Sequence, residues 1–168
     1  VADNKGNVIE EVLFYAKQSN AGLYFTKKGL VYIYSDHKLS EPDTDQIATY
    51  EAAKDTFSVA RFEMSLPNCN SNPEVVSEGE MFAKTNYYLA HCPDGISDVR
   101  SYQKLIYKDV YPEIDWVVYF NGNDGEIKYD FVVHPGGNPS SIKMKYDGAK
   151  DISIDELGNL NVGSQLGS

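Results

Sequence analysis

Two aspartates, Asp115 and Asp130, lie inside the most apolar stretches of the chain, where a carboxylate costs free energy unless it is paired or hydrogen-bonded. Two carboxyl groups can hydrolyse a glycosidic bond when they lie about 5 to 10 Å apart in a cleft. With 25 acidic residues among 168, however, some pair of acids reaches this distance by chance. Hydrogen bonding to loop backbone or pairing with Lys128 is the simpler explanation, so a hydrolase with a carboxylate pair is the less favoured alternative.

The histidines form no recognisable catalytic or metal-binding motif. His37, His91 and His134 are far apart in the sequence, and the pair His91-Cys92 lacks a second C-x-x-C or H-x-x-x-H element. Residues 121–126 offer oxygen ligands but do not complete the twelve-residue calcium loop, and turn formation by Asn, Asp and Gly explains them. The sequence also lacks G-x-S-x-G and H-E-x-x-H. We therefore predict no metal, no cofactor and no enzymatic activity.

Two cysteines, Cys69 and Cys92, lie beside turn residues that could bring them together. A disulfide requires Cα atoms about 4.4 to 6.8 Å apart, a distance that sequence does not supply. An even number of cysteines in a loop-rich domain is typical of an oxidising compartment. The pattern favours a disulfide, with two free thiols as the alternative.

Tyrosine is the aromatic residue that dominates the composition, with 13 of 168 residues. Tyrosine rings at a sheet surface present flat apolar faces with polar tips, as a carbohydrate-binding site requires. The candidates for such a site are Tyr102, Tyr107, Tyr111 and Tyr119. Packing in the core or at its rim is the competing explanation for these rings.

The charge of the chain excludes one large class of partner. The net charge is −10 and the pI is near 4.7, so the protein would repel a phosphate backbone, and no stripe of Lys and Arg interrupts the acidic surface. No apolar run approaches the roughly 20 residues that span a bilayer. We expect neither nucleic-acid binding nor a membrane span, and leave protein or glycan at a cell surface as partners.

These side chains must be positioned by strands, because short runs rich in Val, Ile, Tyr and Phe alternate with turn residues every 8 to 12 residues or so. We predict a single all-β domain over 1–168, an antiparallel β-sandwich of about ten short strands. A polar, acidic insertion near residues 36–56 could contain a short helix. The expected strands are 12–17, 22–26, 30–34, 57–64, 74–77, 86–89, 99–108, 114–121, 126–133, 141–146, 151–155 and 159–162.

The strongest signal is the hairpin of 114–121 and 126–133, whose register follows from the pattern of apolar residues. If Asn121 lies opposite Glu126, every pair on one face is apolar, whereas a slip of one residue sets Trp116 against Asp130. The expected apolar pairs are Phe120–Ile127, Val118–Tyr129, Trp116–Phe131 and Ile114–Val133. The opposite face, with Tyr119–Lys128, Val117–Asp130 and Asp115–Val132, is mixed and partly wet.

The order of several motifs resembles one bacterial family, the N-terminal β-rich domain of secreted proteins that carry seven-bladed β-propeller (SBBP) repeats. The resemblance covers almost the whole chain and is carried by 3–8, 13–16, 85–88, 107–115, 128–131 and 135–139 with Ile142 and Gly148. In Bacteroidetes such proteins bear a C-terminal gliding-motility or sorting segment. The acidic segment from Ser35 to Thr56 and the two cysteines depart from the family pattern.

This resemblance implies a module of unknown function, secreted or displayed at the cell surface, with no catalytic residues to carry over. It also implies a longer protein of which the chain is the N-terminal module. We expect residues 163–168 to be the start of a further hairpin that is truncated. We therefore expect a non-enzymatic structural or interaction module of a surface or secreted repeat protein, with adhesion as one role. A carbohydrate-binding module is the alternative.

Overall fold

The computed structural model describes residues 9–18, 21–38, 56–89, 92–121 and 126–163, and the structural statements below refer to these residues. They form strands and one short 3-10 helix, η1, with no α-helix in the described part of the chain. The elements are β1 (Phe14–Gln18), β2 (Ala21–Thr26), β3 (Gly29–Lys38), β4 (Thr56–Ser65), β5 (Val75–Glu80), β6 (Thr85–Leu89), β7 (Cys92–Val99), β8 (Tyr102–Tyr111), β9 (Ile114–Asn121), β10 (Glu126–Val133), η1 (Pro139–Ser141), β11 (Lys145–Asp147), β12 (Asp151–Ile154) and β13 (Leu160–Gly163).

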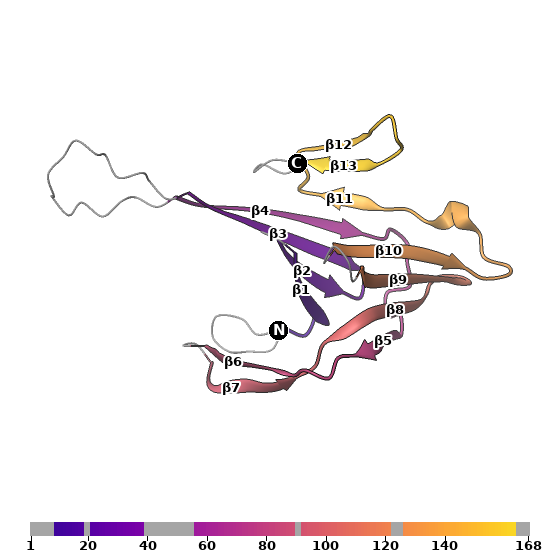
Figure 1. Cartoon of the computed structure of the whole chain (residues 1–168). Coiled ribbons are helices and arrows are strands. Elements are labelled where there is room, and N and C mark those ends of the chain that lie inside the picture. Colours follow the sequence, from indigo (N-terminus) through magenta and orange to yellow (C-terminus); the bar gives the residue numbers. More distant parts are fainter. Residues whose placement is uncertain (1–8, 19–20, 39–55, 90–91, 122–125, 164–168) are drawn as a thin grey trace, which may run out of the picture.

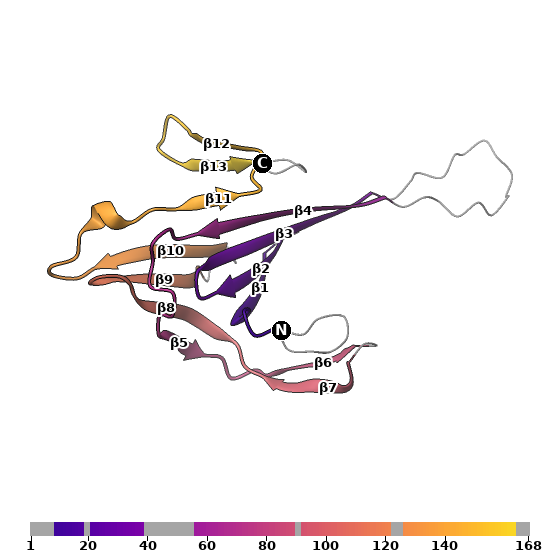
Figure 2. The same ribbon diagram turned by 180° about the vertical axis from the view of Figure 1, so that it is seen from behind.

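The strands form two larger antiparallel sheets in a sandwich-like arrangement and two separate hairpins. One sheet has the order β1-β2-β3-β4-β11 and the other β10-β9-β8-β5. The hairpins β6-β7 and β12-β13 are two-stranded sheets of their own, and Figures 1 and 2 show β6-β7 extending away from β5 and β8. The predicted all-β class with antiparallel sheets of short strands is confirmed.

One hydrophobic core joins the two larger sheets. The five-stranded sheet contributes Leu23, Leu30 and Met64, and the four-stranded sheet contributes Tyr107 and Trp116, all with at most 2% of their surface exposed. The rings of Tyr107 and Trp116 pack with centroids 4.8 Å apart. Burying side chains of this size contributes about 1.5 to 3 kcal/mol each. This core is what fixes the two sheets against each other.

The predicted register of the β9-β10 hairpin is confirmed at every pair, from Asn121 opposite Glu126 to Ile114 opposite Val133. The residues of its turn, 122–125, lie outside the described residues. On the apolar face Trp116 and Ile114 of β9 are fully buried, whereas Phe120, next to the turn, and Val133, opposite Ile114 on the edge strand β10, are 44% and 41% exposed. The core therefore covers β9 up to the turn end and leaves the end of β10 partly open.

Two segments differ from the sequence prediction. Residues 92–99, of which only Val99 was expected in a strand, form β7, which pairs with β6 through two irregularities in register, and Gly95 and Asp98 have positive φ values of 69° and 58°. The turn-forming residues are accommodated as bulges and do not end the strand. Residues 141–146, predicted as one strand, instead contain the end of η1, and the strand begins only at Lys145.

The polar insertion can be compared with the prediction only at its two ends. Asp36–Lys38 continue β3, and their partners on β4 run from Ser58 back to Thr56. The predicted helix within 39–55 lies outside the described residues, as do all but the first residue of the C-terminal segment 163–168 that was expected to begin another hairpin.

Candidate functional site

Asp115 is the one buried charged side chain among the described residues, with 4% of its surface exposed. Its Oδ2 accepts a hydrogen bond from Lys108 Nζ at 2.6 Å, and His134 Nε2 lies 3.1 Å from the same oxygen. Its Oδ1 accepts the backbone N–H of Asp109 at 2.9 Å. Both carboxylate oxygens are therefore engaged, by two side chains and one main-chain group.

These contacts hold an irregular region of the four-stranded sheet. The register between β8 and β9 shifts between Tyr107 and Tyr111, and Asp109 within this bulge has a φ of 48°. A non-glycine residue with positive φ is disfavoured unless its surroundings hold it, and Asp115 does so by accepting its N–H. His134 also donates its backbone N–H to Glu113, whose φ is 58°. Asp115 thus connects the bulge in β8 to the end of β10.

The environment of Asp115 keeps it ionised. Burial alone would raise its pKa, but the hydrogen bonds from Lys108, from the Asp109 backbone and from His134, together with the charge of Lys108, outweigh burial and lower the pKa below its usual value. An ionised carboxylate with both oxygens occupied is a poor proton donor. A structural role by hydrogen bonding to backbone is as expected, but the partner is Lys108, and the expected Lys128 was wrong.

Asp130, the second acid of the carboxylate-pair hypothesis, is exposed on β10 opposite Val117. Its hydrogen bond with Tyr119 raises the pKa of the tyrosine hydroxyl. Asp115 and Asp130 share the mixed face of the hairpin because Asp115 lies opposite Val132, two residues further along β10. That face was expected to be partly wet, and Asp115 is buried in it. Asp115 is buried and Asp130 is exposed, whereas glycoside hydrolysis requires two carboxyl groups that both reach the substrate.

The structure does not bring the four predicted ligand-binding tyrosines together at one surface. Tyr107 and Tyr111 are 0% and 3% exposed and belong to the core. Tyr111 Oη donates to the Pro67 carbonyl at 2.9 Å. Tyr102 is half-buried with its ring edge-on to Phe14 at 6.1 Å, and Tyr119 is half-exposed beside Asp130. Alternation along β8 explains this, since Tyr107 points inward with Leu105.

Two other tyrosines, Tyr15 on β1 and Tyr24 on β2, do meet at the surface. They lie directly opposite each other in the sheet, and their ring centroids are 5.0 Å apart with an angle of 49° between the planes. Sequence reasoning missed this pair because the sequence between the two strands contains no Asn-Gly or Asp-Gly signal from which their register could be predicted.

The predicted disulfide is not present, because Cys69 carries a free, half-buried thiol whose pKa is raised by burial. Cys69 lies in the connection from β4 to β5, where its N–H donates to Leu66. The backbone of Cys92 begins β7, and its side chain is outside the described residues. Figures 1 and 2 show the β4-β5 connection and the start of β7 far apart, on opposite sides of the view, which is the physical reason for the correction.

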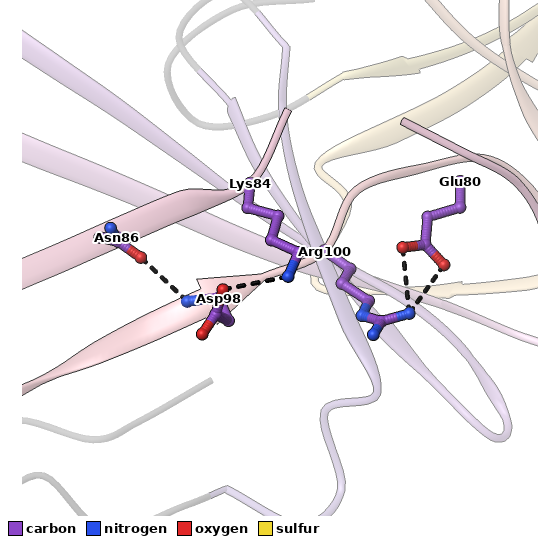
Figure 3. Close-up of polar contacts among 5 residues, drawn as sticks. All are labelled: Glu80, Lys84, Asn86, Asp98 and Arg100. Carbon is purple, nitrogen blue, oxygen red and sulfur yellow. Dashed lines mark hydrogen bonds and ion pairs between the residues drawn. The ribbon is translucent and has the colours of Figure 1, made fainter. Parts of the chain in front are cut away.

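The β6-β7 hairpin is joined to β5 and β8 by two short segments, 81–84 and 100–101, which we call the neck. The N–H of Met81 donates to the Ser101 carbonyl across the neck at 2.8 Å. Arg100 Nη1 contacts both carboxylate oxygens of Glu80 at 3.0 and 2.9 Å, and Lys84 Nζ lies 3.1 Å from Asp98 Oδ1. Asn86 accepts the N–H of Asp98 at 2.9 Å. Figure 3 shows these contacts among Glu80, Lys84, Asn86, Asp98 and Arg100. Polar contacts therefore brace the hairpin where it leaves the core.

Large apolar side chains in the neck and on β6 face solvent. Met81 and Phe82 in the neck are 49% and 105% exposed, and Tyr88 on β6 is 80% exposed. Monomeric proteins expose single apolar side chains often, whereas several of them within one projecting segment are typical of an interaction surface. We call Met81, Phe82 and Tyr88 the hairpin surface.

The β12-β13 hairpin has a similar composition. All four residues of β12 are exposed, and Ile154 and Leu157 have 73% and 88% of their surface in solvent. Its tight turn is closed by Asp155, which accepts the N–H groups of Leu157 and Asn159 at 2.9 and 2.8 Å. The hairpin was predicted, but the exposure of its apolar side chains was not.

A family model matches residues 2–168, nearly the whole chain, and its description is domain of unknown function (DUF7948). The chain belongs to this family. No curated protein and no solved structure gave a significant match to the DUF7948 domain. Among the residues that the structure describes, no helix of the DUF7948 domain is long and apolar enough to cross a bilayer, and no cluster of three His, Cys, Asp or Glu side chains could hold a metal ion.

Proposed function

We propose that this DUF7948 domain is a non-enzymatic interaction module of a bacterial protein that is secreted or displayed at the cell surface. The motif resemblance to the N-terminal domain of SBBP-repeat proteins supports the setting. The observation that carries the interaction role is the hairpin surface, with Phe82 fully exposed and Tyr88 80% exposed on an element that polar contacts hold in place.

Large apolar side chains left in solvent are informative because the domain alone gains no free energy from their burial. Burying a side chain of the size of Phe82 against another molecule would contribute about 1.5 to 3 kcal/mol. The contact of Arg100 Nη1 with both carboxylate oxygens of Glu80 and the pair of Lys84 and Asp98 restrict the hairpin before any partner arrives, so less conformational entropy is lost on binding. These features fit a surface arranged for another protein.

The chemistry of the acids supports a role other than catalysis. Asp115 serves the fold, by holding Asp109 and His134, and its pKa is lowered by those contacts. A glycosidase needs one carboxyl group whose pKa is raised so that it can donate a proton. The hydrolase alternative therefore has the weaker support.

Two measurements on the natural gene product test the proposal. On intact cells, an amine-reactive biotin reagent that does not cross membranes should label the protein, and labelling only after lysis would contradict the extracellular setting. Hydrogen exchange should be at least about tenfold slower for the amides of β6 in the natural assembly than in the isolated 168-residue domain, because a partner covers the hairpin.

Paired variants test whether the hairpin surface is the part of the domain that the partner covers. Phe82→Ser with Tyr88→Ser should abolish the extra protection of β6, whereas Ile154→Ser, which alters an exposed apolar residue on the other hairpin, should leave it intact. Equal exchange rates for β6 in the domain and in the natural assembly would show that no partner binds the hairpin surface.

A further inference from the structure

We infer that Tyr15 and Tyr24, with Lys17 and Ser35 beside them, form a binding site for one pyranose ring of a glycan. The site lies on the outer face of the five-stranded sheet, opposite to the core, and is separate from the hairpin surface. It uses none of the four tyrosines that the sequence suggested for this role. It is independent of the proposed function.

Gly22 is the residue that allows the two rings to lie against the sheet. A Cβ built on Gly22 would lie 3.2 Å from Tyr24 Cε2 and 3.3 Å from Tyr15 Cε2, so both rings lean over the glycine. A Cβ at this position would force the ring atoms to shift by a few tenths of an ångström. The two ring planes are inclined by 49° to each other, and Tyr15 remains 47% exposed, so its ring is accessible to a ligand.

The register places polar groups next to the rings. Lys17 lies opposite Gly22 on β1, and Ile33 lies opposite Gly22 on β3, with Ser35 following on the same face. Together with the two tyrosines they surround a hollow of about 300 Å³. This volume is at the lower end of the range of about 300 to 1,000 Å³ for small-molecule sites, which suits one sugar unit.

The chemistry of the lining matches a sugar ring. A pyranose has an apolar face of C–H groups and a rim of hydroxyls, and a tyrosine offers an apolar ring face with a polar tip. Lys17 supplies donors only, and Ser35 supplies both a donor and an acceptor. Burial and the neighbouring hydroxyls of Tyr24 and Tyr87 raise the pKa of Tyr15, so its hydroxyl keeps its proton at neutral pH and can donate to an oxygen of the ligand.

The position of the site suits a chain of sugars as well as a single unit. β1 is at the edge of its sheet, so the rings are not enclosed by a further strand on that side. This open edge leaves the next units of a glycan free to extend past β1 into solvent.

Calorimetric titration with four defined hexasaccharides, built from glucose, mannose, N-acetylglucosamine and a uronic acid, tests the inference. At least one should bind the folded domain, and Tyr15→Ala should weaken that binding by about tenfold or more, since the stacking face is lost. Tyr15→Phe keeps the ring and should cause a smaller loss. Leu157→Ala, which removes an exposed apolar side chain from the turn between β12 and β13, should cause none.

A second variant, Lys17→Ala, tests the site even if Tyr15→Ala fails to fold. Lys17 is exposed, so Lys17→Ala should fold normally and should weaken the uronate hexasaccharide more than the neutral ones. Circular dichroism checks that each variant is folded. Absence of binding by all four hexasaccharides at millimolar concentration, or binding that Tyr15→Ala does not change, would overturn the inference. Either result would leave the hydrogen-exchange test of the hairpin surface unaffected.

Discussion

The β9-β10 hairpin and the β6-β7 hairpin are both antiparallel pairs with large aromatic side chains, yet their surroundings are opposite. In β9-β10 the register is continuous over eight pairs, and Trp116 and Ile114 are completely buried against the other sheet. In β6-β7 the register shifts twice, and Tyr88 is 80% exposed. A hairpin of this protein is thus held either by a core or by polar contacts at its base.

Different forces stabilise the β9-β10 and β6-β7 hairpins. Burial stabilises β9-β10 through the area that Trp116 and its neighbours remove from water. The neck of β6-β7 relies on ion pairs such as Arg100–Glu80, whose side chains are 54% and 43% exposed, and solvent and salt screen such pairs. Stability should therefore be insensitive to changes in the neck and sensitive to changes in the core.

The largest effect is expected for Trp116→Ala. Removing a fully buried indole from between Tyr107 and Phe131 leaves a cavity that the two sheets can fill only in part. The free energy of unfolding should fall by about 3 to 5 kcal/mol, as measured by chemical denaturation. Tyr88→Ala is the matched control from the exposed hairpin. A loss for Trp116→Ala no larger than that of this control would end the distinction between the two hairpins.

The next largest effect is expected for Asp115→Asn, which keeps the volume but removes the charge that Lys108 and Asp109 contact. The loss at pH 7 should be about 1 to 3 kcal/mol. The pKa of Asp115 is lowered in the folded state, so its contribution is complete above the unfolded value of about 4 and fades as the pH falls below it. Denaturation curves across pH should show wild type and variant converging in acid. A difference that stayed constant from pH 7 to pH 2 would exclude this role for the carboxylate.

A smaller and local effect is expected for Arg100→Ala. The variant loses both contacts to Glu80, but Met81 still donates to the Ser101 carbonyl across the neck. Global unfolding should be nearly unchanged, while the amides of β6 and β7 should exchange faster with solvent because the brace is weakened. The same amides should exchange faster in wild type at high salt. Unchanged exchange rates in both experiments would show that the ion pair does not brace the hairpin.

The smallest effect on stability is expected for Phe82→Ser. The side chain is fully exposed, so its removal should change the free energy of unfolding by no more than about 0.5 kcal/mol. Its midpoint of denaturation should match that of wild type. A clear destabilisation would mean that Phe82 contributes to the fold, and the proposed interaction surface would lose its main residue.

Much of the central fold was predictable from the sequence because alternation of period two is strongly constrained where one face is buried. In β9-β10 a slip of one residue would place Trp116 against Asp130, so one register was clearly favoured, and it is the observed one. The strand at 92–99 was missed for the converse reason. It contains Pro93, Asp94 and Gly95, which favour turns, and none of residues 95–99, the part of the strand whose burial is described, is buried.

The surface sites were less predictable, since they depend on contacts between residues distant in sequence. The partner of Asp115 is Lys108 on the neighbouring strand because Tyr107 lies opposite Trp116, so that the next residues of β8 and β9 meet, and the register of β8 with β9 was not predicted from the sequence. The pair of Tyr15 and Tyr24 depends on the register of a hairpin with no strong turn signal. Tyr107 and Tyr111 were chosen as ligand-binding residues although the same alternation that identified the strand also allowed them to point inward.

The burial of Trp116 also has a spectroscopic consequence. It is the one tryptophan of the chain, it is shielded from water, and the rings of Tyr107 and Tyr129 lie 4.8 and 6.2 Å from it, close enough to transfer excitation energy to it. Its emission should lie at short wavelength in the native protein and shift to the red only when the two sheets separate. A ligand bound over Gly22 or at the hairpin surface would leave that emission unchanged, so the fluorescence of Trp116 reports whether the core is intact and does not respond to binding at either surface.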